Sequence, residues 1–123
     1  RFGGYRPESE PETLALTELC RTANIRQAAA LHSQGEVIYW SYGNSEPPRA
    51  KKMAEIMSTS SGYALDVPVG IADGGGFKDW FITEFRRPGF TIELGTGKNP
   101  LPAADAEKIY MRVREMLMLF IMM

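Results

Sequence analysis

The sequence predicts an α/β fold in which helices cover both faces of a mixed β-sheet. Segments with helical spacing of apolar residues alternate with short apolar runs, in the order helix, strand, strand, helix, short strand, helix, strand, helix. Continuous apolar runs of this length are typical of strands covered on both faces. With 123 residues and 44% hydrophobic content, we expect one unit, residues 1–123, with a modest core.

Composition and charge exclude several classes of function. The formal net charge is −1, which gives no reason to expect a nucleic-acid partner. The longest apolar run, Met116–Met123, is too short to span a membrane. Cys20 is the single cysteine, so the chain has no internal disulfide. The chain begins at Arg1 without an initiator methionine and without a signal peptide, and we expect it to be cut from something longer.

The first predicted helix follows an irregular lead-in, residues 1–8. Ser9 and Glu12 have the spacing of a capping box, in which each side chain bonds to a free backbone amide of the first turn. An apolar stripe follows at helical spacing and is formed by Leu16, Leu19, Cys20 and Ala23. Asn24 is a suitable helix stop.

The middle of the chain contains two predicted strands and a helix. Residues 25–31 are predicted to form a strand covered on both faces, although its three alanines have weak strand propensity. Residues 37–40 are rich in β-branched and aromatic side chains and predict the next strand. A helix over residues 49–59 should end near Gly62, and a short edge strand should follow within residues 63–68.

The remaining elements are a glycine-rich loop, two helices and a strand. The loop covers residues 70–76 and lacks the lysine and hydroxyl residue of a phosphate loop. An aromatic stripe predicts a helix over Phe77–Phe85. A buried strand is predicted over Phe90–Leu94, and a final helix over Ala103–Met122. The methionine-rich end of that helix indicates core or partner contacts.

Two polar residues at the ends of apolar strands are the candidates for chemistry. Functional groups in such sheets gather at the carboxyl ends of the strands, where His32 and Glu93 lie. Glu93 would share a strand face with Thr91, where a carboxylate is costly unless it is paired, metal-bound or hydrated. A lone histidine is more often a hydrogen-bonded structural residue than a ligand, so the residues alone leave both interpretations open.

Other chemistries lack the residues that they need. One histidine and one cysteine cannot form the usual zinc site of His and Cys ligands. The chain has no Gly-x-Ser-x-Gly motif for a serine nucleophile. Cys20 lies on an apolar stripe, which argues against a nucleophilic role.

Five strings, taken together and in order, resemble the second half of the zinc carboxypeptidase family. They are Ser9-Glu10-Pro11-Glu12-Thr13, Leu31-His32-Ser33-Gln34-Gly35, Gly75-Gly76-Phe77-Lys78-Asp79-Trp80-Phe81, Phe85-Arg86-Arg87-Pro88-Gly89-Phe90-Thr91-Ile92-Glu93-Leu94-Gly95 and Asn99-Pro100-Leu101-Pro102. The most similar branch is the bacterial γ-D-glutamyl-L-diamino acid endopeptidases, which cut peptidoglycan stem peptides. The resemblance covers nearly the whole chain and implies the fold of the C-terminal half of that catalytic domain.

The resemblance implies a role for four residues. His32 matches the third zinc ligand, and Glu93 matches the general base that activates zinc-bound water and passes the proton to the leaving amine. Lys78 matches a position that lines the substrate side-chain pocket, where a cation would suit the distal carboxylate of diaminopimelate. The alternative interpretation is that Lys78 is an ordinary solvated lysine on a helix surface. Ser33, next to His32, is expected to contact substrate.

The departures from the family pattern are equally specific. The upstream His-x-x-Glu motif that supplies two zinc ligands is absent, as is the Asn-Arg pair that grips the substrate carboxylate. The mobile tyrosine of pancreatic-type enzymes would fall near Ile71. The resemblance therefore implies zinc in the complete domain, and weak or no zinc binding and no activity for this chain alone. We expect an open sheet edge that the missing N-terminal half, or a second copy of the chain, would cover.

Several alternatives stay open at this point. The chain is either a zinc metallopeptidase acting on γ-D-glutamyl-diaminopimelate bonds or a non-catalytic interaction module on the same scaffold. A metallocarboxypeptidase acting on ordinary peptides is a further possibility, and a separate chain supplying the N-terminal half is another. The relatives implied by the resemblance act at the cell envelope, in secreted form or inside sporulating bacterial cells, and the sequence does not choose between these compartments.

Overall fold

The structure is a computed structural model that describes residues 5–67 and 74–123. Its elements are α1 (Pro11–Thr22), β1 (Ala28–His32), β2 (Val37–Tyr39), α2 (Ala50–Ser61), β3 (Ala64–Asp66), α3 (Phe77–Phe85), β4 (Gly89–Glu93), the 3-10 turn η2 (Ala103–Asp105) and α4 (Ala106–Met122). This order and the α/β class confirm the sequence prediction. The predicted bounds of α3 are those observed, and Gly62 ends α2 in a left-handed conformation.

The four strands form one mixed sheet in the order β1-β4-β2-β3. β1 pairs with β4 in parallel, β4 pairs with β2 in antiparallel, and β2 pairs with β3 in parallel. β4 therefore joins β1 to the β2–β3 pair. Within the described residues, β1 has a neighbour on one side only.

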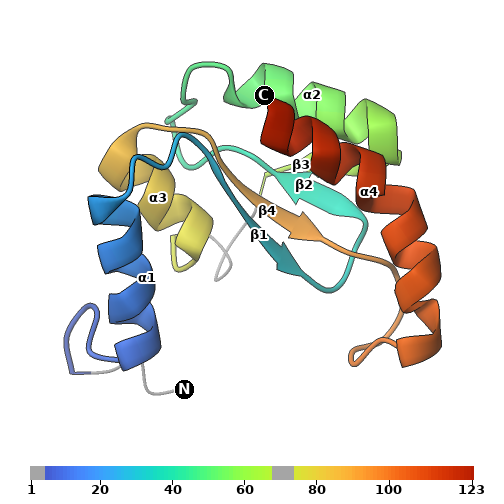
Figure 1. Cartoon of the computed structure of the whole chain (residues 1–123), viewed down its shortest axis with the longest axis horizontal. Coiled ribbons are helices and arrows are strands. Elements are labelled where there is room, and N and C mark those ends of the chain that lie inside the picture. The colour runs from blue at the N-terminus through green and yellow to red at the C-terminus, as the bar shows by residue number, and fades with distance from the viewer. Residues whose placement is uncertain (1–4, 68–73) are drawn as a thin grey trace.

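Alternation along β4 divides the sheet into an apolar face and a polar face. Phe90 and Ile92 are fully buried and pack with Ile38 of β2 against α2 and α4. α2 and α4 lie against each other on this side of the sheet, whereas α3 packs on β1 and β4 from the other side (Figure 1). Gly89, on the α3 side, permits this approach, because a Cβ there would lie 3.2 Å from the backbone oxygen of Lys78.

The start of α1 differs from the prediction. The N-cap is Glu10 and makes no side-chain capping bond, while Ser9 Oγ donates to Glu10 Oε1 at 3.0 Å. The predicted capping box of Ser9 and Glu12 is therefore wrong. The Ser9 hydroxyl donates to Glu10 instead of capping the helix. The Glu12 carboxylate lies in the first turn, where the helix dipole favours a negative charge.

The predicted apolar stripe of α1 is only partly buried. Leu16 and Leu19 are 42% and 54% exposed, whereas Cys20 is buried. Arg21 of α1 pairs with Glu8, which precedes the helix, at 2.6 Å, and reaches α3 through Glu84 at 3.8 Å and the ring of Trp80 at 5.7 Å. The buried residues of α1 are Thr17 and Cys20, so helical spacing alone predicted the wrong inward face.

The structure also corrects the prediction for the strand before His32. β1 begins at Ala28, and residues 25–27 precede the ladder. Its residues are half-buried or exposed, with Leu31 at 48%, so the prediction of a strand covered on both faces was wrong. The cause is its terminal position in the sheet, which short apolar runs do not reveal.

Several remaining predictions are settled only in part. β3 confirms a short edge strand, while Pro68, Ile71 and the first part of the predicted glycine loop lie outside the described residues. In α4, Met116 is buried but Met118 and Met122 are exposed. None of the helices in the described parts of the chain has the length and hydrophobicity needed to cross a bilayer.

The two faces of the sheet give a direct test of stability. Ile92→Ala should lower the free energy of unfolding by about 2–5 kcal/mol, because it leaves a cavity between β4 and the α2–α4 layer. Urea unfolding measures the change. Met118→Ala is the matched control: its side chain is 64% exposed, so the change should stay within about 0.5 kcal/mol. Equal losses in both variants would contradict this packing.

Candidate active site

The parallel register of β1 and β4 brings the two strand-end residues together. His32 is the direct partner of Glu93 in the ladder, so both side chains leave the same face of the sheet. That face is opposite to the one that buries Ile92. His32 is exposed and Glu93 is half-buried, and neither side chain has a hydrogen bond or ion pair to the described residues. An imidazole and a carboxylate are thus adjacent and available to other groups.

A cleft of about 480 Å³ opens over these two residues. The sheet supplies one wall through His32, Tyr39, Thr91 and Glu93, and the start of α3 supplies the other through Lys78 and Asp79. We call this the His32–Glu93 cleft. It contains three of the four residues that the sequence analysis singled out, from segments far apart in the chain.

Lys78 lies in this cleft but is not a solvated surface residue. Its side chain is 4% exposed, and Nζ donates to the carbonyl oxygen of Ser41 at 2.6 Å. Nζ also forms an ion pair with Asp79 and lies 5.8 Å from the ring centre of Tyr42. The other oxygen of Asp79 accepts the amide of Gly74 at 2.9 Å. The ammonium is therefore held at a fixed place in the cleft wall.

Ser33 lies outside the His32–Glu93 cleft. It is exposed in the connection after β1 and lines a neighbouring groove of about 630 Å³, together with Leu31, Leu94 and Ile109. We call this the β1 groove. The Ser33 carbonyl oxygen accepts Asn99 Nδ2 at 2.8 Å, and the Ser33–Gln34 peptide bond is cis. Ser33 and His32 both line the β1 groove, and Glu93 does not.

Tyr39 is a cleft residue that sequence reasoning missed. It pairs with Thr91 across the antiparallel ladder and so shares the face of Glu93. Burial raises the pKa of the Tyr39 phenol, and the negative charges of Asp66 and Glu93 raise it further. Strand alternation placed Tyr39 on one face of β2, but only the pairing of β2 with β4 shows that this is the face of the cleft.

Backbone contacts tie together the connections that follow β1 and β4. Leu94 N donates to His32 O at 2.8 Å, and Gly35 N donates to Gly95 O at 2.7 Å. Gly97 N donates to Gln34 Oε1 at 3.2 Å. These bonds extend the pairing beyond the strands and fix the two ends that carry the imidazole and the carboxylate.

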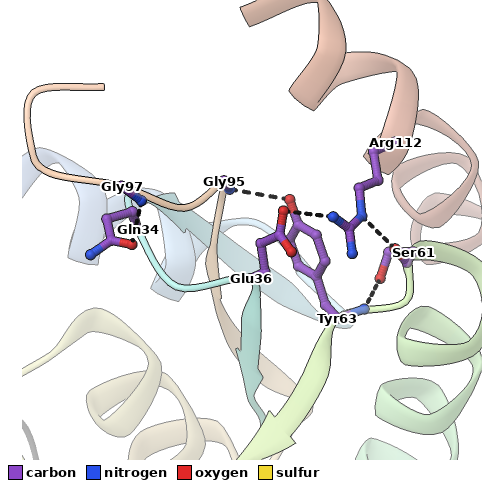
Figure 2. Close-up of polar contacts among 7 residues, drawn as sticks. All are labelled: Gln34, Glu36, Ser61, Tyr63, Gly95, Gly97 and Arg112. Carbon is purple, nitrogen blue, oxygen red and sulfur yellow. Dashed lines mark hydrogen bonds and ion pairs between the residues drawn. The ribbon is translucent and has the colours of Figure 1, made fainter. Parts of the chain in front are cut away.

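A buried tyrosine anchors this junction to the helices (Figure 2). Tyr63 is 1% exposed, and its hydroxyl oxygen accepts Gly95 N at 3.2 Å. Arg112 reaches from α4 over the Tyr63 ring, at 5.2 Å from its centre, and bonds to Glu36 at 2.7 Å and to the Ser61 carbonyl at 3.0 Å. The positions of β1 and β4 at the cleft are thereby linked to α2 and α4.

The described residues do not form a complete metal site. Across residues 5–67 and 74–123, no group of three or more His, Cys, Asp and Glu side chains could hold a metal ion. The imidazole of His32 is exposed and borders the cleft, which suits one ligand position. Catalytic zinc normally has three protein ligands. The described residues therefore do not by themselves supply the three protein ligands of such a centre.

Comparison with known proteins identifies similar chains. A family model described as zinc carboxypeptidase matches residues 1–116. Gamma-D-glutamyl-L-diamino acid endopeptidase 1 of Lysinibacillus sphaericus is 46% identical over 110 residues, which are 89% of this chain and 27% of that protein. The uncharacterized protein YqgT of Bacillus subtilis strain 168 is 38% identical over 109 residues, 89% of this chain and 29% of that protein. The chain thus spans less than a third of the length of either relative.

Solved structures share the fold at low sequence identity. The carboxypeptidase A from Helicoverpa armigera matches with a TM-score of 0.75 and 19% identity, covering 96% of this chain and 35% of that one. Thrombin activatable fibrinolysis inhibitor matches with a TM-score of 0.76 and 21% identity, covering 94% of this chain and 34% of that one. At this identity the likeness is one of fold.

The proximity of Tyr39 and Glu93 predicts a shift in a titration. Glu93→Gln should lower the pKa of the Tyr39 phenol, because it removes a negative charge that disfavours the phenolate. NMR titration of the Tyr39 ring, assigned with Tyr39→Phe, measures this. Glu12→Gln on α1 is the control and should have no effect. An unchanged pKa in Glu93→Gln would contradict the placement of the two side chains.

The same phenol predicts a dependence of stability on pH. The pKa of Tyr39 is higher in the folded state than in the unfolded chain. The contribution of the neutral Tyr39 phenol to the free energy of unfolding is therefore complete below about pH 10 and is lost as the pH rises further. Denaturant unfolding of the wild type and Tyr39→Phe should therefore show a smaller loss at alkaline pH in the variant. Parallel losses in both proteins would refute this.

The Tyr63 anchor predicts a local change in hydrogen exchange. Tyr63→Phe keeps the ring but removes the acceptor of Gly95 N, and should cost about 0.5–1.5 kcal/mol of stability. Amide exchange at Gly95 should accelerate more than exchange in α1. Tyr110 on α4 is 60% exposed, so Tyr110→Phe should change neither the stability nor the exchange rate at Gly95. Uniform acceleration across the chain would argue against a local anchor.

Proposed function

Because the chain belongs to the zinc carboxypeptidase family, we propose that it carries part of the active site of a zinc metallopeptidase. His32 provides one zinc ligand, and Glu93 acts as the general base. One observation supports this assignment above the others: His32 and Glu93 are direct partners in the β1–β4 ladder, on the face that opens into a cleft.

The chemistry that this chain contributes is proton transfer. Zinc, when bound in the complete domain, polarises the substrate carbonyl and makes water more acidic. Glu93 accepts the proton of the attacking water and later donates it to the leaving amine. Its carboxylate has no bond to the described residues that would compete for this role. The backbone bonds between the β1 and β4 ends keep Glu93 beside His32 during both transfers.

The proposed substrate is a peptidoglycan stem peptide, cut at the bond between γ-D-glutamate and diaminopimelate. A relative 46% identical to this chain is named gamma-D-glutamyl-L-diamino acid endopeptidase 1. The fixed ammonium of Lys78 in the His32–Glu93 cleft suits the distal carboxylate of diaminopimelate. Ser33 contacts the substrate from the loop after β1. A metallocarboxypeptidase acting on ordinary peptides is the alternative within the same family.

The proposal concerns the complete protein, because a zinc centre needs ligands besides His32. The remaining ligands belong to an N-terminal half of the domain, which covers the free edge of β1. Exposed Leu31 and Tyr110 border the β1 groove on that edge and suit an apolar partner. In the absence of that half, a second copy of the chain is the competing occupant of the same edge.

Substitution of Glu93 in the complete protein tests the assigned base. Glu93→Gln should lower kcat for L-alanyl-γ-D-glutamyl-diaminopimelate by about 100- to 10,000-fold and leave bound zinc unchanged. His32→Ala should lose zinc as well as activity. Glu12→Gln should alter neither. Metal analysis and release of diaminopimelate measure both effects, and hydrolysis retained in Glu93→Gln would exclude this residue as the base.

The isolated chain gives a separate test. Residues 1–123 alone should bind zinc at least about 100-fold more weakly than the complete protein, because one histidine replaces a set of three ligands. Calorimetry measures the binding, and the same sample should not hydrolyse the tripeptide. If the complete protein also bound no zinc, a non-catalytic interaction module would be the better description.

A further inference from the structure

Arg112 of α4 is not among the residues that line the His32–Glu93 cleft, but it contacts three groups beside the ends of β1 and β4 (Figure 2). Nη1 pairs with Glu36 at 2.7 Å, Nε donates to the Ser61 carbonyl oxygen at 3.0 Å, and the guanidinium carbon lies 5.2 Å from the centre of the Tyr63 ring. A planar guanidinium presents its donors in fixed directions. These contacts therefore hold Glu36 and Tyr63 at defined places relative to each other.

The Arg112 contacts are poorly explained by stability alone. The side chains of Arg112 and Glu36 are 42% and 25% exposed, and an ion pair at such a position contributes little, because water screens it. The apolar residues Val113 and Met116 are the ones that bury α4. We therefore expect the chain to fold without the Arg112 side chain, so that its effect on function can be measured.

The contacts of Arg112 close a ring of five residues, which we call the Arg112 circuit. The ion pair holds Glu36, and its neighbour Gly35 donates from N to Gly95 O at 2.7 Å. Gly95 N donates to the hydroxyl oxygen of Tyr63 at 3.2 Å, and the Tyr63 ring leads back to Arg112. In a closed set of contacts each member is held from two sides, so the whole restrains more than its separate pairs.

Both connections in the Arg112 circuit start at the proposed site. Glu36 follows His32 by four residues, and Gly95 follows Glu93 by two. Glu36 has a left-handed φ of 52°, which a residue with a side chain keeps only where its surroundings impose it. At Gly95 a Cβ would lie 2.7 Å from Cδ1 of Ile109, so this backbone lies directly against α4. The two connections thus have little freedom to move apart.

We propose that Arg112 is a positioning residue for the reaction. It acts through Glu36 and Tyr63 and fixes the separation between the His32 imidazole and the Glu93 carboxylate. This rests on the proposed function, in which Glu93 serves two proton transfers and must keep one distance from the reacting water. Because the α3 wall of the cleft is not part of the Arg112 circuit, the effect should fall on the chemical step and not on substrate binding.

Kinetics of the complete, zinc-loaded protein test this role. Arg112→Met keeps most of the side-chain length but removes every donor, and should lower kcat for L-alanyl-γ-D-glutamyl-diaminopimelate by about tenfold per bound zinc. KM should stay within about twofold. Met116→Ala, at a buried position on the same helix, is the matched control: it should cost more stability but leave kcat unchanged. An unchanged kcat in Arg112→Met, or an equal loss in Met116→Ala, would overturn the proposal.

A double-mutant cycle tests whether Arg112 acts through Glu36. Glu36→Ala should also lower kcat, and the double variant should lose little more than Arg112→Met alone, because either change opens the same Arg112 circuit. Losses that multiply in the double variant, or a full kcat in Glu36→Ala, would show that the circuit does not carry the effect.

Amide exchange in the same complete protein reports on the Arg112 circuit without reference to activity. Exchange at Gly35 and Gly95 should accelerate by at least about tenfold in Arg112→Met, while exchange within α1 stays at the wild-type rate. Equal exchange at both glycines in the two proteins would overturn the restraint.

The failures of the two proposals are distinguishable. A wild-type protein that hydrolyses no γ-D-glutamyl peptide would reject the proposed reaction, and the role of Arg112 in that reaction with it. Hydrolysis at the same kcat by the wild type and Arg112→Met would support the reaction and overturn the role of Arg112 alone.

Discussion

The candidate site depends on the register of one parallel strand pair. His32 stands beside Glu93 because β1 and β4 pair residue by residue from Ala28 and Gly89 onward. A slip by one residue would turn one of the two side chains to the opposite face of the sheet. That face is closed, because Phe90 and Ile92 are buried there under α2 and α4. The apolar core thus sets the orientation of the polar pair without contacting it.

The face of the sheet that carries His32 and Glu93 can hold polar side chains because α3 covers it only in part. α3 packs closely where Gly89 admits it and leaves a cleft over the strand ends. At those ends, backbone bonds between the β1 and β4 connections replace the ladder, and Tyr63 and Arg112 fasten them to the helices. Rigid support behind an open face is the arrangement that precise positioning of catalytic groups requires.

Local patterns in the sequence predicted much of this fold. Aromatic spacing gave α3 to the residue, and Gly62 marked the end of α2, because these signals act within one or two turns. Spacing failed where burial depends on distant elements, as for exposed Leu19 and for the edge position of β1. The ends of the apolar strands indicated His32 and Glu93, and the family resemblance gave them roles and added Lys78. Their meeting in one cleft, together with Tyr39 and the buried Lys78–Asp79 ion pair, follows from strand register and helix packing, which the sequence does not display.

A crystal structure of the complete protein with zinc, located by its anomalous scattering, would show whether His32 and Glu93 have these separate roles. We expect a zinc ion bound to a ring nitrogen of His32 at about 2.0–2.1 Å. The Glu93 carboxylate should lie on the same face, close enough to contact a water molecule on the ion but outside its ligand set. Zinc bound away from His32, or coordinated directly by Glu93, would contradict the division of roles between these two neighbouring residues.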